Sequence, residues 1–274
     1  MSRLGIELLS VLGMPPVEHV KLTAQLGCSH ISTGLTQLPF NPHGYPAWSL
    51  RDDASLRREM KAAMREYGVV IGLGEGFAVR PNQDLRDRQA DFDLMAELGA
   101  ERVGGVSMEP DLERTKDQFA LLVEYAQQRG MNATIEFAPP HPVGNLAAAL
   151  AIVKHVNRPN FRLLIDAMHF FRSGGSASQL AALDPKLIGY AQLCDVPLRP
   201  TIQDYMQEAM FARMLPGSGE LPLAAFVRAL PHDVPIGLEV PMRAQAEAGV
   251  SPYDRLLPAV VAAQALLHSG DQSA

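Results

Sequence analysis

Four oxygen-bearing side chains in the second half of the chain each follow a short apolar run. They occur in TIEFAPP, LLIDAMHF, GYAQLCD and IGLEVP, and they are Glu136, Asp166, Gln192 and Glu239. Carboxylates that face one another repel and raise one another's pKa unless a cation lies between them. Three carboxylates and one amide suit Mn²⁺ or Mg²⁺ better than zinc, which prefers nitrogen and sulfur ligands. The sequence therefore predicts one divalent ion, with Mn²⁺ the first choice, if the fold brings these residues together.

Three further residues could bind a substrate beside such an ion. His169 lies three residues after Asp166, where it is either a hydrogen-bond partner for a substrate or a solvated loop residue. Arg213 precedes the motif PGSGE at 216–220, and its guanidinium could bind a carboxylate or an oxyanion. Glu75 lies between glycines in GLGEGFAV, which would let a ligand approach closely, or it is a solvated turn residue. Other polar residues near predicted strand ends are expected to be rim residues: Glu7, His30, Glu109 and His141.

The elements that must position these residues repeat along the chain. Four times an amphipathic segment ends at a glycine and a strand-like run follows, at Gly27, Gly68, Gly99 and Gly130. Glycine just past a helix end supplies the left-handed residue that stops the helix, so each junction predicts helix, cap and strand. Together with the later segments the chain contains eight strand–helix pairs, which predicts a parallel sheet and a single (β/α)8 TIM barrel. The alternative is an open doubly wound sheet, but VLGMPPVE after the first predicted strand lacks its glycine-rich phosphate loop.

The barrel prediction accounts for the four polar strand ends. All strands of a parallel barrel open at their carboxyl ends onto one face, where side chains far apart in sequence converge. Glu136, Asp166, Gln192 and Glu239 would follow the fifth to the eighth strands. The predicted fold would therefore gather them at the mouth of the barrel.

Composition narrows the class of protein. The 274 residues are 47% hydrophobic, which fits one domain spanning residues 1–274. The 24 Lys and Arg against 30 Asp and Glu give a net charge of −6, which disfavours nucleic acid as a partner. No apolar run approaches the ~20 residues of a membrane span and no cleavage site is evident, so we expect a soluble cytoplasmic protein. Cys28 and Cys194 have no zinc-type spacing and are interpreted as reduced core thiols.

Two segments fall outside the regular alternation. We expect residues 197–215 to form a lid insertion over the barrel mouth, with Gly217 and Gly219 as hinges. Its apolar residues, including Tyr205 and Met210, indicate a substrate with an apolar part, although a helical core pattern explains them as well. Residues 269–274 are polar and are expected to form a frayed tail.

Glu136, the Asp166–His169 pair, Gln192, PGSGE and Glu239 together resemble the xylose isomerase-like TIM barrel superfamily over essentially the whole chain. The superfamily contains sugar isomerases and epimerases, inosose and 3-dehydroshikimate dehydratases, and the endonuclease IV branch. GYAQLCDVP followed by LPGSGELPL is most similar to the hydroxypyruvate isomerase branch, although segment 197–215 is longer than expected there. The resemblance implies Glu136, Asp166, Gln192 and Glu239 as metal ligands, with His169 beside them for substrate.

The chemistry that the resemblance implies is proton abstraction from a hydroxy-carbonyl substrate, a sugar or a keto acid. A metal ion that chelates two adjacent substrate oxygens makes the neighbouring C–H bond acidic as an enediolate develops. Glu136 and Glu239 would be both ligands and bases, so isomerisation, epimerisation and dehydration all remain open. A nuclease is disfavoured because the chain has eight His and an acidic balance. A non-catalytic sugar-binding barrel and a lyase subunit that needs a partner chain, such as those cleaving oxidised glycosides, also remain open, as does a homo-oligomer.

Overall fold

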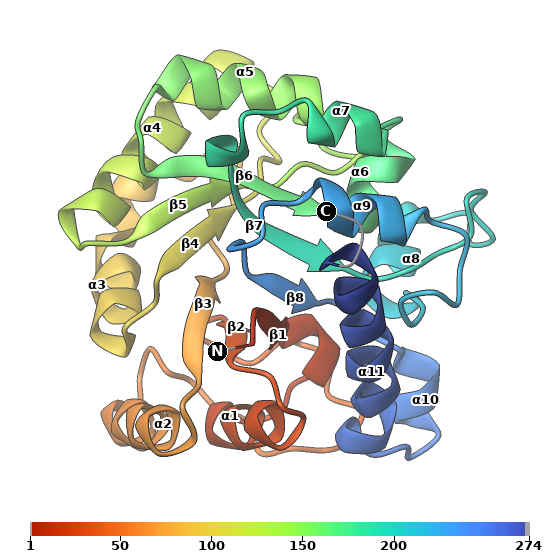
Figure 1. Ribbon diagram of the computed structural model, residues 1–274. Helices are drawn as coiled ribbons and strands as arrows, with labels where there is room; N and C mark the ends of the chain where they lie inside the picture. Colours follow the sequence, from red (N-terminus) through yellow and green to blue (C-terminus); the bar gives the residue numbers. More distant parts are fainter. Residues whose placement is uncertain (1, 272–274) are drawn as a thin grey trace.

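A computed structural model of the protein describes residues 2–271. The chain folds into a closed barrel of eight parallel strands (Figure 1). The strands pair in sequence order, and β8 closes the barrel against β1. The predicted (β/α)8 TIM barrel is therefore confirmed. The strands are β1 (Leu4–Ile6), β2 (His30–Thr33), β3 (Val70–Gly74), β4 (Arg102–Gly105), β5 (Asn132–Ile135), β6 (Phe161–Asp166), β7 (Ile188–Leu193) and β8 (Ile236–Leu238).

Helices surround the strands and connect one strand to the next (Figure 1). The α-helices are α1 (Pro16–Gln25), α2 (Ala54–Tyr67), α3 (Gln89–Leu98), α4 (Leu112–Gln128), α5 (Leu146–Val156), α6 (Ala167–Arg172), α7 (Ala177–Ala181), α8 (Tyr205–Phe211), α9 (Leu223–Ala229), α10 (Arg243–Glu247) and α11 (Pro252–Asp271). Three short 3₁₀ helices are η1 (Leu8–Val11), η2 (Leu85–Arg88) and η3 (Pro185–Leu187). None of the helices within residues 2–271 is both long and apolar enough to cross a membrane.

The predicted helix ends follow from local backbone chemistry. Gly27, Gly68, Gly99 and Gly130 all have positive φ, between 67° and 82°, so the four predicted junctions are confirmed. At the opposite ends, the Asp53 carboxylate accepts hydrogen bonds from Ser55 N and Leu56 N at the start of α2. Such caps satisfy backbone donors that the first helical turn leaves free.

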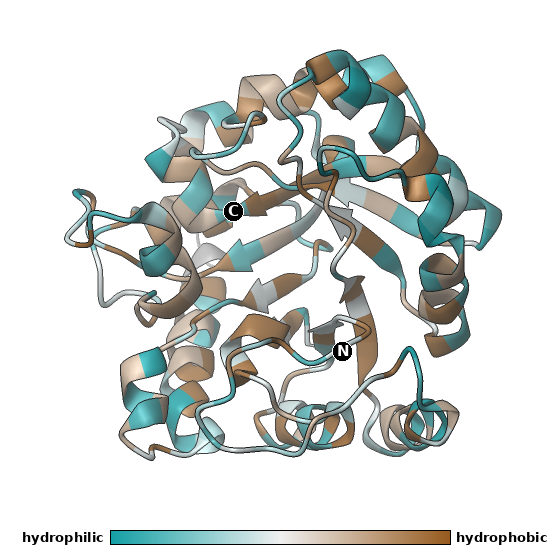
Figure 2. Cartoon of the chain, turned by 180° about the vertical axis from the view of Figure 1, so that it is seen from behind, coloured by the Kyte–Doolittle hydropathy of each residue, from teal (hydrophilic) through white to brown (hydrophobic). Residues whose placement is uncertain are grey.

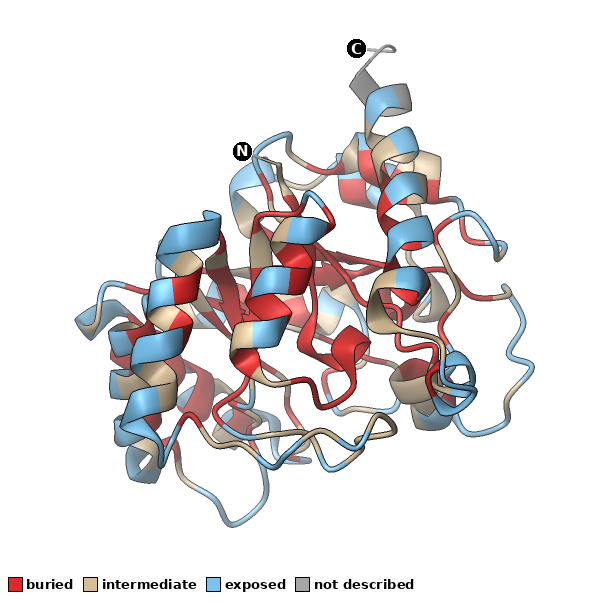
Figure 3. Ribbon diagram, turned by 90° about the horizontal axis from the view of Figure 1, so that it is seen from below, coloured by how far each residue is buried: buried red, intermediate tan, exposed pale blue. Residues whose placement is uncertain are grey.

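The core has two parts. Leu73, Leu164 and Tyr190 fill the inside of the barrel, and a larger apolar layer separates the strands from the helices. Figure 3 shows the buried strands inside helices whose outer faces are exposed, and Figure 2 shows the matching apolar strands and polar outer helix faces. Leu164 and Tyr190 lie two residues before Asp166 and Gln192. Since side chains on a strand alternate, these polar residues lie one layer above the apolar plug.

Three details differ from or extend the sequence predictions. Asp166 is followed at once by α6, so His169 lies in a helix rather than in a loop. Helix α11 continues to Asp271, into the predicted frayed tail, and residues 272–274 of that tail lie outside the described part of the chain. Cys28 and Cys194 are free and buried, as predicted.

Candidate active site at the carboxyl ends of the strands

The four polar strand ends singled out in the sequence converge at one end of the barrel. Asp166 and Gln192 are register partners on β6 and β7, and Gln192 Nε2 donates to Glu239 Oε1 over 3.2 Å. Glu136 follows β5, and its Oε1 lies 3.5 Å from His169 Nε2. The convergence has a simple cause, since parallel strands of one barrel end on the same face.

A fourth acid, Glu7, joins this cluster, although it was expected to be a rim residue. Its side chain is fully buried, accepts a hydrogen bond from Tyr190 OH over 2.6 Å, and accepts another from Gln192 Nε2 over 3.1 Å. Gly237 makes this burial feasible, because a Cβ there would overlap the Glu7 carboxylate. A sequence signal existed: Gly-Ile-Glu at 5–7 matches Gly-Leu-Glu at 237–239, and these two segments pair in register on β1 and β8.

Glu75 lies at the same mouth, at the end of β3. Its carboxylate accepts a hydrogen bond from Ser32 Oγ on β2. Ser32 Oγ also accepts a hydrogen bond from the Leu8 backbone N–H over 2.7 Å, so the hydroxyl joins Glu75 to the chain that follows β1. Glu75 is therefore a member of the cluster and not a solvated turn residue.

Arg213 lies inside the cluster. Its Nη1 is 2.5 Å from Asp166 Oδ2 and 2.8 Å from Glu239 Oε2, and its side chain is 3% exposed. Its Nε donates to the Ala209 backbone oxygen over 2.7 Å, so the last turn of α8 fixes the direction of the guanidinium. Within the described residues Arg213 is the one arginine or lysine that pairs with any of these five carboxylates. The sequence predicted a metal ion held by Glu136, Asp166, Gln192 and Glu239, and the structure pairs two of these four residues with the Arg213 guanidinium.

Burial and crowding control the protonation of the cluster. Burial raises the pKa of Glu7, of Glu75 to about 7 and of Glu136 to about 8, and nearby carboxylates add to the effect. The pKa of Glu239 is also raised, because burial outweighs the effect of Arg213. For Asp166 burial acts in the same direction, but Arg213 and His169 outweigh it and lower the pKa. Asp166 is therefore the carboxylate that pairs with Arg213 in its ionised form.

His169 is held from both sides. Its backbone N–H donates to Asp166 Oδ1 over 2.8 Å, which caps α6, and its Nδ1 lies 2.6 Å from the Tyr205 hydroxyl. This leaves Nε2 directed at Glu136. Burial lowers the pKa of His169 to about 4, so the imidazole is neutral near pH 7. Tyr205 was noted in the sequence only for its apolar ring, and its partner lies 36 residues away.

Segment 197–215 lies at the mouth of the barrel, where its Arg213 joins the cluster. Helix α8 supplies Met206, Ala209 and Met210 to the wall of the cavity above the cluster. Glu208 on the other face of α8 is buried and lies 3.0 Å from Arg172 Nη2 of α6. The segment is therefore attached to the barrel by a buried ion pair. Whether it moves as a lid remains a prediction.

The PGSGE turn after this segment has a fixed geometry. The buried Asp195 carboxylate accepts hydrogen bonds from Gly217 N over 2.9 Å and from Leu221 N over 3.0 Å. Gly219 packs against the same carboxylate, where a Cβ would not fit. Asp195 thus holds the turn that places Arg213.

Two adjoining cavities open at the cluster. The outer chamber has a volume of about 200 Å³, and the inner chamber has a volume of about 130 Å³. Glu75, Val106, Glu136 and Glu239 line both, and Gln192 lines the inner chamber alone. The acids are therefore accessible to a small molecule despite their burial.

The remaining polar residues of the predicted rim have different positions. His141 lines the outer chamber, and Glu109 is buried and lies 2.5 Å from Arg114 Nη1. His30 begins β2, which places it at the amino end of the strand and away from the mouth.

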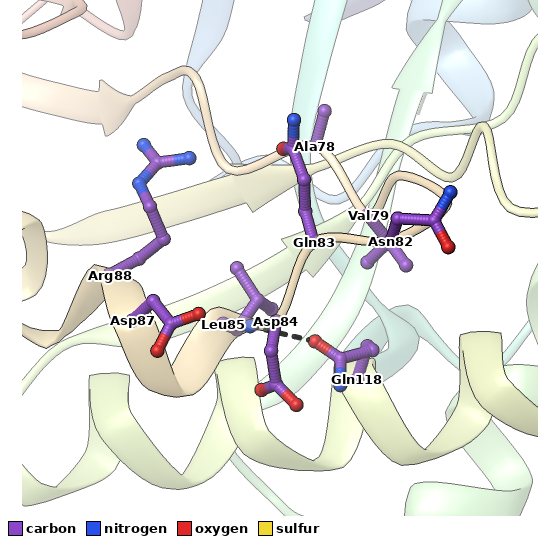
Figure 4. A pocket seen from close by; sticks show the side chains of 9 residues that line it. All are labelled: Ala78, Val79, Asn82, Gln83, Asp84, Leu85, Asp87, Arg88 and Gln118. Carbon is purple, nitrogen blue, oxygen red and sulfur yellow. Dashed lines mark hydrogen bonds between the residues drawn. The ribbon is translucent and has the colours of Figure 1, made fainter.

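Two other cavities lie beside the mouth. One of about 300 Å³ is lined by the loops after β2 and β3, including Arg51 and Arg88, which share Asp91. The other, of about 180 Å³, lies along residues 78–88 (Figure 4). Its Gln118 accepts a hydrogen bond from Leu85 N, and Asp84 caps η2. These polar groups already have structural partners, so this cavity is a weaker candidate site.

Three side chains of the cluster are spaced as metal ligands. Glu136, Asp166 and His169 each offer an atom within 4.8 Å of the others. Within residues 2–271 no other three histidine, cysteine, aspartate or glutamate side chains are spaced in this way. In addition, Gln192 Oε1 is buried and has no hydrogen-bond partner. An unpartnered buried oxygen beside crowded carboxylates is the environment that a cation would satisfy. The residues therefore fit a divalent ion.

The protein is a parallel barrel with a carboxylate cluster and a candidate ligand site at its mouth. A family model described as xylose isomerase-like TIM barrel matches residues 20–256, and the chain belongs to this family. A sequence search of curated proteins gives no match.

Several solved structures share the fold. An IOLI protein with a bound zinc atom is 18% identical with a TM-score of 0.78, and the alignment covers 98% of this chain and 99% of that one. A D-allulose 3-epimerase from Methylomonas sp., in complex with D-allulose, is 16% identical with a TM-score of 0.69 and 96% coverage of both chains. A probable 3-DHS dehydratase from Bacillus anthracis is 12% identical with a TM-score of 0.73, covering 93% of this chain and 98% of that one.

Proposed function

We propose that the protein is a divalent-metal-dependent isomerase or epimerase that acts on a hydroxy-carbonyl substrate by proton abstraction. One observation carries the proposal: five carboxylates at the ends of β1, β3, β5, β6 and β8 cluster with one arginine among them, and Glu75, Glu136 and Glu239 line cavities open to a small molecule. Burying carboxylates with too few cations beside them destabilises the folded protein. Stability therefore does not explain the cluster, which indicates a site for a ligand.

Glu136, Asp166, Gln192 and Glu239 are the proposed metal ligands, and His169 lies within ligand distance of two of them. The mostly oxygen donors favour Mn²⁺ or Mg²⁺, while the imidazole also allows zinc. A bound ion would polarise the substrate carbonyl and make the neighbouring C–H bond more acidic.

The proton transfer itself belongs to side chains of the protein. Glu136 and Glu239 both line the two chambers, so each can reach a substrate bound at their junction. One carboxylate takes the proton from the carbon next to the carbonyl, and the other carboxyl returns a proton. Return to the adjacent carbon gives isomerisation, and return to the opposite face gives epimerisation.

The other polar groups would orient the substrate. His169 has Nδ1 engaged by Tyr205, so Nε2 is the ring atom available to a substrate oxygen beside Glu136. Arg213 lines the outer chamber, and its guanidinium would bind an oxyanion there. Glu75 would accept a hydrogen bond from a substrate hydroxyl in either chamber.

Dehydration is the alternative outcome of the same first step. If the substrate has a leaving hydroxyl one carbon beyond the carbanion, loss of that hydroxyl replaces return of the proton. The crowded acids support this reaction equally well, since a carboxyl group can protonate the departing hydroxyl. A lyase subunit that requires a partner chain would share the site and show no activity alone.

Hydrogen exchange tests the proposal whatever the product of the reaction is. The metal-loaded protein is incubated in D₂O with a panel of hydroxy ketones and hydroxy aldehydes, and deuterium at the carbon next to the carbonyl is measured by NMR and mass spectrometry. We expect Glu136→Gln and Glu239→Gln to lower the exchange rate at least ~100-fold, because glutamine cannot act as a base. Glu124→Gln, on the exposed face of α4, is the control.

Metal content is measured in the same variants, because loss of the ion would also lower exchange. A variant that keeps its metal and most of its exchange activity after Glu239→Gln would refute the two-glutamate mechanism. New vinylic signals together with release of water would instead assign dehydration.

A further inference from the structure

The outer chamber is polar at one end. Arg213 contacts Glu239, His169 faces Glu136, and both glutamates also line the inner chamber. His141 also lines the outer chamber. The polar side chains of the outer chamber therefore gather where it meets the inner one.

The rest of the outer chamber is apolar. The wall consists of Leu9, Leu38, Val106, Met108, Ala138, Met206, Ala209 and Met210. These residues come from the segments after β1, β2, β4 and β5 and from α8, which are five separate parts of the chain. The core-facing side of a single helix, α8, would explain three of them. It does not explain why five segments present apolar side chains to the same space.

Several of these side chains are not fully covered by protein. Leu38, Val106, Met108, Met206 and Met210 are half-buried, in contrast to the fully buried core residues of the strands. Where apolar side chains face an open chamber, an apolar ligand that displaces the water in contact with them binds favourably, because apolar surface is removed from water. The two methionines of α8 also adapt their shape to a ligand.

We infer that the substrate carries an apolar, ring-sized substituent next to its hydroxy-carbonyl end, and not the polyol chain of a simple sugar. The inference rests on the proposed function and specifies its substrate class. The chamber of about 200 Å³ is large enough for such a group, since a cavity of roughly 150 Å³ holds benzene. The hydroxyls of a polyol would lose water there and find few partners on the apolar wall.

Two ligands of similar size and with the same reacting end test the inference. Hydroxymethyl benzyl ketone and a ketopentose both have a HOCH₂–CO– end, and they differ in whether the remainder is a phenyl ring or a chain of hydroxyls. Binding of each to the Mn²⁺-loaded protein is measured by titration calorimetry, which does not depend on turnover. We expect the benzyl ketone to bind at least about 10-fold more tightly.

Variants of α8 identify the wall responsible. Met210→Gln keeps the length of the side chain and adds a polar end, so we expect it to weaken benzyl ketone binding about 5-fold or more and to leave ketopentose binding within about 2-fold. Met210→Leu, which stays apolar and conserves the volume of the side chain, should retain most of the preference. Leu198→Gln makes the same type of change at an exposed position of segment 197–215 and is the control.

A ketopentose that binds as tightly as the benzyl ketone, or a benzyl ketone that does not bind, overturns the inference. Deuterium exchange into sugars but not into the benzyl ketone would also overturn it and would leave the proposed function intact. Absence of exchange into any ligand, with the binding preference present, would refute the proposed chemistry and support the apolar subsite.

Discussion

Removal of the Arg213 guanidinium is the sharpest test of how the carboxylate cluster is stabilised. Arg213→Met keeps most of the apolar volume of the side chain but leaves Asp166 and Glu239 buried without their cation, at positions 2.5 and 2.8 Å from the lost Nη1. Breaking a buried ion pair by removing one partner typically costs 3–5 kcal/mol, so we expect a loss of about 3 kcal/mol in the free energy of unfolding. The value lies at the lower end because Glu239, whose pKa is raised, can take up a proton.

Urea unfolding in the presence of a chelator measures this loss at neutral pH. An unchanged slope of the unfolding free energy against urea concentration would show that the unfolded state is the same in both proteins. Arg86→Met is the matched control, because Arg86 pairs with Asp84 and its side chain is 65% exposed. We expect that control to change stability by less than about 0.5 kcal/mol, as exposed ion pairs contribute little.

A second substitution and a metal titration separate loss of charge from loss of packing. Asp166→Asn placed in the Arg213→Met background should recover at least about 1 kcal/mol, because the buried carboxylate that lost its cation is replaced by a neutral amide. Mn²⁺ should raise the stability of Arg213→Met more than that of the unaltered protein, since a cation can take the place of the guanidinium. A loss below about 1 kcal/mol in Arg213→Met would show that the carboxylates are hydrated or protonated without it, and that Arg213 does not stabilise the cluster.

Other side chains of the cluster and of the core give three more expected outcomes. Glu136→Gln and Asp166→Asn should each lower the affinity for Mn²⁺ at least about 10-fold, measured by calorimetry and by metal analysis. Tyr205→Phe should change the tautomer balance of the His169 ring in ¹⁵N NMR spectra, because the hydroxyl no longer engages Nδ1, and should cost about 1 kcal/mol of stability. His19→Gln should flatten the dependence of stability on pH, because burial lowers the pKa of His19 to about 4 from 6.5. Between these values the unfolded chain binds a proton that the folded protein does not, so stability falls as pH falls from 6.5 to 4, by at most about 3 kcal/mol.

Each of these has an outcome that would contradict it. Full metal occupancy in both carboxylate variants would remove them from the ligand set. An unchanged His169 spectrum in the tyrosine variant would mean that the hydroxyl does not select the tautomer. The exposed His155→Gln is the control for the pH series, and an equal flattening in both histidine variants would show that His19 is not responsible.

The repeating architecture could be predicted from the sequence because it depends on local chemistry. The glycines at 27, 68, 99 and 130 stop helices through their own backbone conformation, and strand-like runs follow within a few residues. Once eight such units are recognised, the convergence of Glu136, Asp166, Gln192 and Glu239 follows from the geometry of a parallel barrel. Segment 197–215 was also recognised as an insertion, because it interrupts the alternation, and its role as a lid remains a prediction.

Only the tertiary structure decided how the charges inside the cluster are arranged. Glu7 reaches Tyr190 across 183 residues of sequence, through space that a missing side chain at Gly237 leaves open. Arg213 lies against Asp166, 47 residues away, because α8 and the turn held by Asp195 place it there. The sequence by itself determined which strands end in acids, since this is a property of each strand. The pairing of Arg213 with particular acids and the composition of the apolar wall beside them depend on barrel closure and on the path of one long loop. The spacing of residues along the chain specifies neither the closure nor the path.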